Sequence, residues 1–378
     1  MRIKGDWAET TFRSTASEAK VRGSVTFAGE QRARQGKGLD PLVDPSKYDV
    51  VRISNNLLVP KGDQFVLEFG VAMPVESDPD TTGSMGQNVE LVFGALPKVQ
   101  RLLVQGNGAV LRRYHTQIAT GVIQDQVDKF PYQRSQFEPD NEVERQMGLL
   151  VPEKGGGDPE EDYQIGLFAA AYLTKASITA YGLRGYYFPL GDELGRDRLD
   201  REVLQQVFGP SVFEKAFGPK APKDLPSTKE VAEQLLKYWH PFFLQVGASS
   251  HTTKWWREVL GKDRVIILPR TEDVAEVQAT IIGLTEGTLD LQSVPDFLAQ
   301  VRLSRERAAA VAEAVRGIPI GLQKTLPNFD RIPMAGAIFA NRDDIWPIGA
   351  KEAKKPGSGK AEKPPDEGGK KPRPGWKV

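Results

Sequence analysis

The chain has 378 residues, with 50 Lys and Arg against 50 Asp and Glu, so its formal net charge at pH 7 is zero. A neutral chain has no overall field that attracts nucleic acid or an anionic membrane, and we expect neither as a partner. It contains no cysteine, which excludes disulfides, thiolate catalysis and cysteine zinc sites. Since no secretory signal and no stretch of membrane-spanning length is recognisable, we expect a soluble, cytoplasmic protein.

The pattern of the sequence changes near residue 63. Residues 1–62 are polar, with short apolar runs, and we expect them to form an arm of short strands and loops. From Phe65 onward, strand-like and helix-like segments alternate, which is typical of a parallel sheet with helices on both faces. We therefore predict an α/β domain over residues 63–290, built on a doubly wound, Rossmann-like and mainly parallel sheet.

The same pattern predicts the individual elements of this domain. Strands are expected at 65–73, 114–123, 185–190, 242–246 and 264–268. Helices are expected at 87–103, 142–150, 163–175, 201–207, 229–239, 251–260 and 273–285. Asp158 is placed to cap the helix that begins at Tyr163, with Pro159 at its first position and Glu160 and Glu161 in its first turn.

Two further regions follow the domain. Residues 291–349 begin with a charged amphipathic helix at about 293–316 and continue with an apolar segment broken by Pro and Gly, so we expect a helical C-terminal extension that packs on the core. Residues 350–378 are rich in Lys, Pro, Gly and Glu and have almost no apolar side chains. Such a segment cannot offset its ordering entropy by burial, and we expect it to be disordered.

A polar loop lies between the first expected strand and the helix that follows it. It reads Asp-Pro-Asp-Thr-Thr-Gly-Ser-Met-Gly over residues 78–86. Asp80, Thr82 and Ser84 stand at alternate positions, so one carboxylate and two hydroxyls can turn toward a common point. A strand-to-helix loop lies at the carboxyl edge of an open α/β sheet, where ligands bind. Three hard oxygen ligands suit Mg²⁺ or Mn²⁺.

These residues resemble the metal-ion-dependent adhesion site of von Willebrand factor A domains. The signature of that family is Asp-x-Ser/Thr-x-Ser, and Asp80 to Met85 read Asp-x-Thr-Gly-Ser-Met, as in many intracellular members. The family draws a Thr from a glycine-rich loop, which corresponds to residues 155–160, but Gly157 stands near the usual Thr. Asp158 or a water then replaces that hydroxyl. The last family ligand is an Asp after a later strand, here Asp192. The resemblance thus implies the metal ligands Asp80, Thr82, Ser84, Asp158 and Asp192.

The resemblance also implies a function. The protein is expected to be a protein–protein interaction module without catalysis, whose metal keeps one position open for a Glu or Asp of the partner. The segment from Arg184 to Glu193 is similar to bacterial stand-alone von Willebrand A proteins. Those proteins are often encoded beside MoxR-type AAA+ ATPases, so such an ATPase is the first partner that the resemblance implies.

Two alternatives stay open at this stage. Asp78, Asp80 and Thr82 also fit the first motif of haloacid-dehalogenase-type phosphohydrolases, whose resemblance implies Asp78 as nucleophile, Asp80 as acid/base and Mg²⁺ as cofactor. Later matches to that family are Lys175, Asp192 and Asp197, whereas Thr81 stands where those enzymes usually carry Gly. The second alternative is a structural subunit of a larger assembly with a vestigial metal site, which Gly157 favours.

Overall fold

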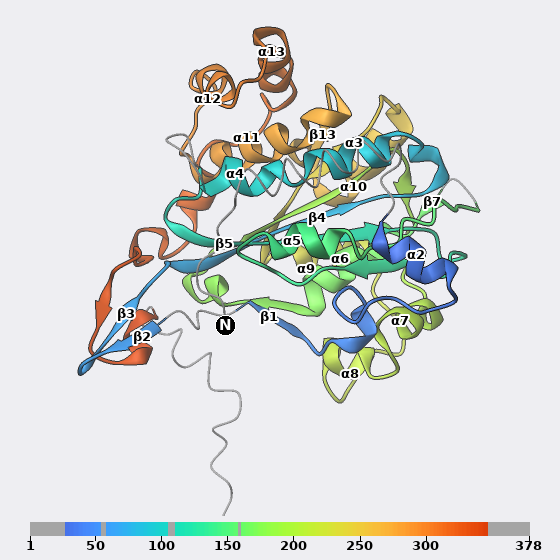
Figure 1. Cartoon of the computed structure of the whole chain (residues 1–378), viewed down its shortest axis with the longest axis horizontal. Helices are drawn as coiled ribbons and strands as arrows, with labels where there is room; N and C mark the ends of the chain where they lie inside the picture. Colours follow the sequence, from blue (N-terminus) through green and yellow to red (C-terminus); the bar gives the residue numbers. More distant parts are fainter. Residues whose placement is uncertain (1–26, 54–57, 105–109, 158–159, 347–378) are drawn as a thin grey trace, which may run out of the picture.

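The computed structural model describes residues 27–53, 58–104, 110–157 and 160–346 (Figure 1). The tail expected to be disordered, 350–378, lies outside these residues, as do residues 1–26 and 54–57 of the expected N-terminal arm. Among the described residues, the structure contains no helix with both the length and the apolar character needed to cross a membrane.

A seven-stranded sheet forms the centre of the molecule, and it confirms the predicted α/β class. Its strands follow the order β13-β12-β9-β4-β5-β6, and β11 also pairs with β9. All pairings are parallel except that of β6 with β5. The bounds are β4 Val71–Pro79, β5 Tyr114–Ile123, β6 Tyr132–Arg134, β9 Gly185–Gly191, β11 Trp239–Pro241, β12 Phe243–Gln245 and β13 Val265–Ile267.

The order of these strands has a reversal at its middle. From β4 the chain adds β5 and β6 on one side, and then returns to add β9, β12 and β13 on the other side. The sheet is therefore doubly wound, and its topological switch point lies between β4 and β9. In open α/β sheets, the crevice at the carboxyl ends of the strands at such a point is the usual place for a ligand.

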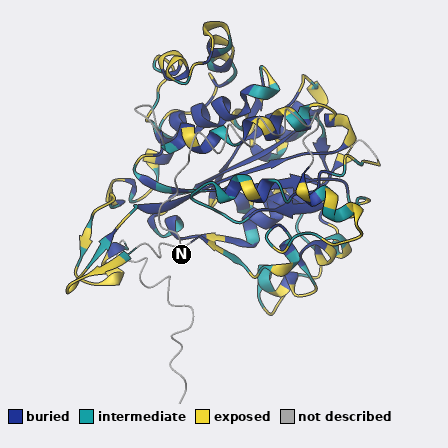
Figure 2. Ribbon diagram, in the orientation of Figure 1, coloured by how far each residue is buried: buried dark blue, intermediate teal, exposed yellow. Residues whose placement is uncertain are grey.

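Helices cover both faces of the sheet and leave two apolar layers between (Figures 1 and 2). Helices α3, α4 and α11 contribute to one hydrophobic cluster, and α6, α9 and α10 to the other. The α-helices are α2 Ala28–Arg34, α3 Asn88–Ala95, α4 Lys98–Val104, α5 Glu142–Met147, α6 Tyr163–Tyr172, α7 Arg201–Phe208, α8 Val212–Phe217, α9 Thr228–Leu235, α10 Ser250–Leu260, α11 Val274–Glu286, α12 Val294–Gln300 and α13 Arg305–Ala314.

The strand expected at 65–73 proves to be two strands that belong to different sheets. The chain turns at Gly70, which has φ of 89°, between β3 (Gln64–Leu67) and β4. β3 pairs with β2 (Leu58–Lys61) and with β14 (Ile338–Phe339) in a small antiparallel sheet that projects at the lower left of Figure 1. The boundary drawn between residues 62 and 63 therefore falls in the turn of the β2–β3 hairpin.

Several expected helices are shorter than predicted. The segment 87–103 is divided near Pro97 into α3 and α4, because proline lacks the amide hydrogen that a helix needs. The segment 293–316 is divided into α12 and α13 near Arg302, which has a φ of 64°. The helix expected at 229–239 ends at Leu235, and Trp239 belongs to β11. The helix expected at 163–175 ends at Tyr172, and β8 (Thr174–Ala176) then pairs with β1 (Val51–Ile53).

The predicted capping of α6 is also wrong. The residue that precedes the helix is Asp162, while Glu160 and Glu161 form the short strand β7 rather than the first helical turn. β7 pairs in parallel with β10 (Leu194–Gly195), and this pairing gives its backbone hydrogen-bond partners outside the helix. Asp158 and Pro159, the predicted cap and first residue, lie outside the described residues.

Two glycines, one in strand β5 and one in helix α3, differ in the space around their Cα atoms, and substituting them tests the packing. A Cβ on Gly121 in β5 would overlap the carboxylate of Asp78, whereas a Cβ on Gly94 in α3 would meet nothing within 4 Å. We expect Gly121→Ala to lower the free energy of unfolding by about 1–3 kcal/mol through overpacking. We expect Gly94→Ala to raise it by about 0.5–1 kcal/mol, since glycine weakens a helix. Urea unfolding of both variants measures this, and equal effects of the two substitutions would contradict the packing described.

Candidate functional site

The candidate site lies at the switch point of the sheet, where β4 and β9 end side by side. Asp80 directly follows β4, and Asp192 directly follows β9. The register is fixed by the backbone, because the Asp80 amide donates to the carbonyl oxygen of Leu190 at 2.7 Å. Two acids that are far apart in sequence therefore lie at the same edge.

A series of short contacts joins four of the five predicted ligand residues. The Thr82 hydroxyl donates to Asp80 Oδ1 at 2.7 Å, and its oxygen lies 3.3 Å from Ser84 Oγ. The Ser84 hydroxyl in turn donates to Asp192 Oδ1 at 2.9 Å. The fifth residue, Asp158, lies outside the described residues, and the role of all five as metal ligands stays a prediction.

Neighbouring elements hold these side chains in place. Thr82 also donates its amide hydrogen to Asp80 Oδ1 at 2.7 Å, and this contact bends the loop as it leaves β4. Tyr163, the first residue of α6, donates its hydroxyl to Asp80 Oδ2 at 2.8 Å. The carbonyl oxygen of Asp192 accepts the hydroxyl of Thr252 on α10 at 3.1 Å. A helix residue thus contacts the carboxylate of Asp80, and another, on the same side of the sheet, contacts the backbone of Asp192.

The glycine-rich loop closes the site. The Gly83 amide donates to the carbonyl oxygen of Gly155 at 2.7 Å, so this loop lies directly against the Asp80 loop. Between them is a pocket of about 330 Å³ with four glycines and two acidic side chains in its wall. Its lining residues are Gly83, Ser84, Gly155, Gly156, Gly157, Glu161 and Glu193. Small, acidic and oxygen-rich, the pocket suits a cation and one more small group.

The acids at this edge are in an environment that disfavours their charged forms. Burial raises the pKa of Asp80 to about 7, against hydrogen bonds from Thr82 and Tyr163 that lower it. Burial, and then the negative charge of Asp80, raises the pKa of Glu161 to about 9. Burial also raises the pKa of Asp192. A bound cation offsets these costs, because it favours each ionised carboxylate.

Any divalent cation bound at this site would need hydroxyl ligands as well as acids. The part of the chain that the structure describes has no group of three or more His, Cys, Asp or Glu side chains placed to hold a metal ion. The Asp80, Thr82, Ser84 and Asp192 side chains instead offer two carboxylates and two hydroxyls. These are hard oxygen donors, which fit Mg²⁺ or Mn²⁺.

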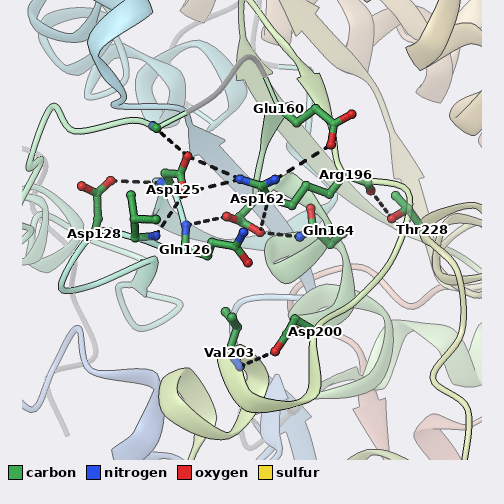
Figure 3. Close-up of polar contacts among 12 residues, drawn as sticks. Asp125, Gln126, Asp128, Glu160, Asp162, Gln164, Arg196, Asp200, Val203 and Thr228 are labelled. Atoms are coloured by element: carbon green, nitrogen blue, oxygen red, sulfur yellow. Dashed lines mark hydrogen bonds and ion pairs between the residues drawn. The ribbon is translucent and has the colours of Figure 1, made fainter.

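Arg196, which the sequence analysis missed, fixes the loops around the pocket (Figure 3). Its guanidinium lies 3.4 Å from Asp125 Oδ2 and 3.2 Å from Asp162 Oδ1, and both aspartate side chains are 1% exposed. Asp125 also accepts the amide of Gly157 at 3.1 Å. One cation therefore connects the loop after β5, the glycine-rich loop and the segment after β10. No local pattern separates Arg196 from the other arginines, so only the fold shows this role.

The structure does not assemble the phosphohydrolase alternative. Asp78, its nucleophile, is fully buried within β4. Its Oδ2 accepts the hydroxyl hydrogens of Tyr187 at 2.7 Å and Tyr132 at 3.1 Å. Asp197 accepts the indole hydrogen of Trp255 at 3.1 Å. A carboxylate enclosed by two tyrosines inside the sheet is not available to attack a phosphate in the pocket.

Comparisons with known proteins give a likeness of overall structure alone. No family model matches the chain. No curated protein matches it either. A solved von Willebrand factor type A structure from Catenulispora acidiphila aligns over 64% of this chain with 11% identity and a TM-score of 0.33. Proximal thread matrix protein 1 from the mussel byssus aligns over 58% with 11% identity and a TM-score of 0.35. The pilus adhesin SpaC from Lactobacillus rhamnosus GG aligns over 56% with 15% identity and a TM-score of 0.35. The alignments cover 48% of the Catenulispora acidiphila chain, 47% of proximal thread matrix protein 1 and 31% of SpaC.

The raised pKa of Asp80 makes the stability of the metal-free protein depend on pH. The pKa rises from 3.8 to about 7 on folding, so the folded chain holds a proton that the unfolded chain has lost. The free energy of unfolding therefore falls as the pH rises through 7, by about 1.4 kcal/mol from this group between pH 6 and pH 8. We expect Asp80→Asn to remove that part of the pH dependence. Urea unfolding in EDTA at both pH values measures it, and an unchanged difference between them contradicts the prediction.

The role of Arg196 predicts a large loss of stability on its removal. Arg196→Met leaves the buried carboxylates of Asp125 and Asp162 without their cation, and we expect a loss of about 3–5 kcal/mol in the free energy of unfolding. Arg198→Met is the control, because Arg198 is an exposed arginine two residues further on. Thermal and urea unfolding of the two variants test this. Similar free energies of unfolding for both would contradict the role of Arg196 in connecting these loops.

Proposed function

We propose that this protein is a divalent-metal-dependent protein–protein interaction module. The observation that carries the proposal is the 2.9 Å hydrogen bond between Ser84 and Asp192, which joins two loops 108 residues apart in sequence. Together with the contacts of Thr82 to Asp80 and Ser84, it gathers two carboxylates and two hydroxyls at one edge. In this proposal the ion is Mg²⁺ or Mn²⁺, and Asp158 is a further ligand from the glycine-rich loop.

The charges of the site support binding of an ion that still accepts a partner. Asp80 and Asp192 balance the two positive charges of the ion, and the hydroxyls of Thr82 and Ser84 add no charge. Mg²⁺ prefers six ligands, so positions remain for water or for an oxygen from another molecule. The pocket beside Ser84 gives that molecule access. We propose that the occupant is a Glu or Asp side chain of a partner protein, because its carboxylate is a hard ligand.

Binding of this kind depends on the ion for an electrostatic reason. Without the ion, a partner carboxylate meets Glu161 and Glu193 in the pocket wall and Asp192 beside it, and like charges repel. With the ion in place, the same carboxylate completes its coordination. We propose a MoxR-type AAA+ ATPase as the first partner to test, on the sequence resemblance alone. Catalysis is not part of the proposal, since the pocket lining has no His or Lys that could activate Ser84.

Calorimetric titration with Mg²⁺ tests the proposal with two matched variants. We expect Ser84→Ala to weaken Mg²⁺ binding at least tenfold, because it removes a ligand and the link to Asp192. We expect Asp78→Asn to leave binding unchanged, because Asp78 is enclosed by Tyr132 and Tyr187 away from the pocket. A phosphohydrolase that uses Asp78 would show the reverse pattern, with a phosphatase activity that Asp78→Asn abolishes.

The intact chain and the same two variants, each immobilised, test the proposed interaction with a MoxR-type ATPase. We expect the intact chain and Asp78→Asn to retain the ATPase in Mg²⁺ and to release it in EDTA, and Ser84→Ala to retain it in neither. If the intact chain gives no heat with Mg²⁺ or Mn²⁺, the metal-dependent module is wrong. The structural subunit with a vestigial site is then the better description.

A further inference from the structure

Glu161 is a buried acid that is neither one of the proposed metal ligands nor an ion-pair partner of Arg196. It is the second residue of β7, whose two side chains point to opposite faces as in any strand. The Glu160 side chain is 49% exposed, whereas Glu161 is only 2% exposed. The pairing of Gly195 with Glu161 holds this segment beside the loop that carries Asp192.

The surroundings of Glu161 leave it short of positive charge. Its Oε2 has no hydrogen-bond partner among the described residues. The Thr82 hydroxyl lowers the pKa of Glu161, whereas the charged groups that act on it most are Asp80, Asp125 and Asp162, all negative. Arg196 pairs with Asp125, Asp162 and Glu160 instead. An ionised carboxylate is costly to bury unless it is paired, and the described residues place no cation beside Glu161.

The position of Glu161 relates it to the candidate metal site. It lines the same pocket as Ser84 and Gly157, and it contacts Thr82, one of the proposed ligands. Gly157 stands where a threonine hydroxyl would face the ion in the resembling family. Glu161 therefore lies on the side of the site that the glycine-rich loop borders.

We propose that Glu161 binds the metal ion through a metal-bound water and so adds a carboxylate to the site beside the glycine-rich loop. The contact is through water because Asp80, Thr82, Ser84 and Asp192 are the direct ligands in the proposed site. Mg²⁺ keeps several of its waters in protein sites, and a buried carboxylate is a strong acceptor for them. This inference rests on the proposed function, and it adds a positioning residue to that site.

Glu161→Gln is the test, with Glu160→Gln as the matched control. Both substitutions exchange a carboxylate for an amide of the same size, at neighbouring positions on opposite faces of β7. Removing an acceptor of this kind weakens metal binding about 10–100-fold, and we expect that loss of Mg²⁺ affinity for Glu161→Gln in calorimetry. We expect less than about a threefold change for Glu160→Gln, since its side chain is largely in solvent.

A second measurement separates this role from a purely structural one. In EDTA no ion is bound beside Glu161, and glutamine has the same size, so we expect Glu161→Gln to leave the melting temperature in EDTA at pH 8 unchanged while Mg²⁺ affinity falls. A structural role would lower both. Glu161→Asp keeps the charge and serves if the amide variant does not fold, with an Mg²⁺ affinity between those of the intact chain and Asp80→Ala.

The remaining outcomes separate a failure of the role of Glu161 from a failure of the proposed function. If Asp80→Ala abolishes Mg²⁺ binding and Glu161→Gln leaves it unchanged, the role of Glu161 is wrong and the proposed function stands. Equal losses in Glu161→Gln and Glu160→Gln would show a general effect of charge and would also overturn it. An intact chain that binds neither Mg²⁺ nor Mn²⁺ overturns the proposed function, and this inference with it.

Discussion

The pairing of β4 with β9 is the constraint on which the candidate site depends. These strands are neighbours in the sheet although more than a hundred residues separate them, and their parallel register brings Pro79 opposite Leu190. The loops that follow them must then begin at the same edge, and Ser84 can reach Asp192. Tyr186 and Tyr187 of β9 donate their hydroxyls to Glu286 and Asp78 on opposite faces of the sheet, and a shift by one residue would turn each of them to the other face and break these hydrogen bonds.

Three buried acids on β4 show how position, rather than residue type, decides a role. Glu76, Asp78 and Asp80 alternate along the strand and so lie on one face. Glu76 pairs with Arg134 at 2.9 Å, and Asp78 accepts hydrogens from two tyrosines, so each acid has partners on one of its two oxygens inside the protein. Burial raises the pKa of Glu76 to about 8 and that of Asp78 to about 6. Only Asp80 lies at the end of the strand, where hydroxyls and the pocket are within reach.

The sequence predicts those parts of the site that depend on local patterns. The alternation of Asp80, Thr82 and Ser84, and the strand before Asp192, are local patterns, and the structure brings these residues together. The prediction fails where pairing comes from distant segments. Glu160 and Glu161 follow a helix-start pattern, yet β10, more than thirty residues later, draws them into a strand. Arg196 carries no local pattern at all, because its importance comes from Asp125 and Asp162, which other loops bring to it.

The excess of negative charge at this edge links metal binding to folding. Asp80, Asp125 and Asp162 act electrostatically on Glu161, and Asp192 acts on Asp80. Arg196 offsets part of this charge, but it pairs with Asp125 and Asp162. Asp80, Asp192 and Glu161 have no such partner among the described residues. Because a ligand that binds only the folded state stabilises it, a divalent cation there would strengthen the fold and hold the glycine-rich loop against Ser84. In that arrangement, the ion that would bind the partner's carboxylate would also stabilise the loops of the site.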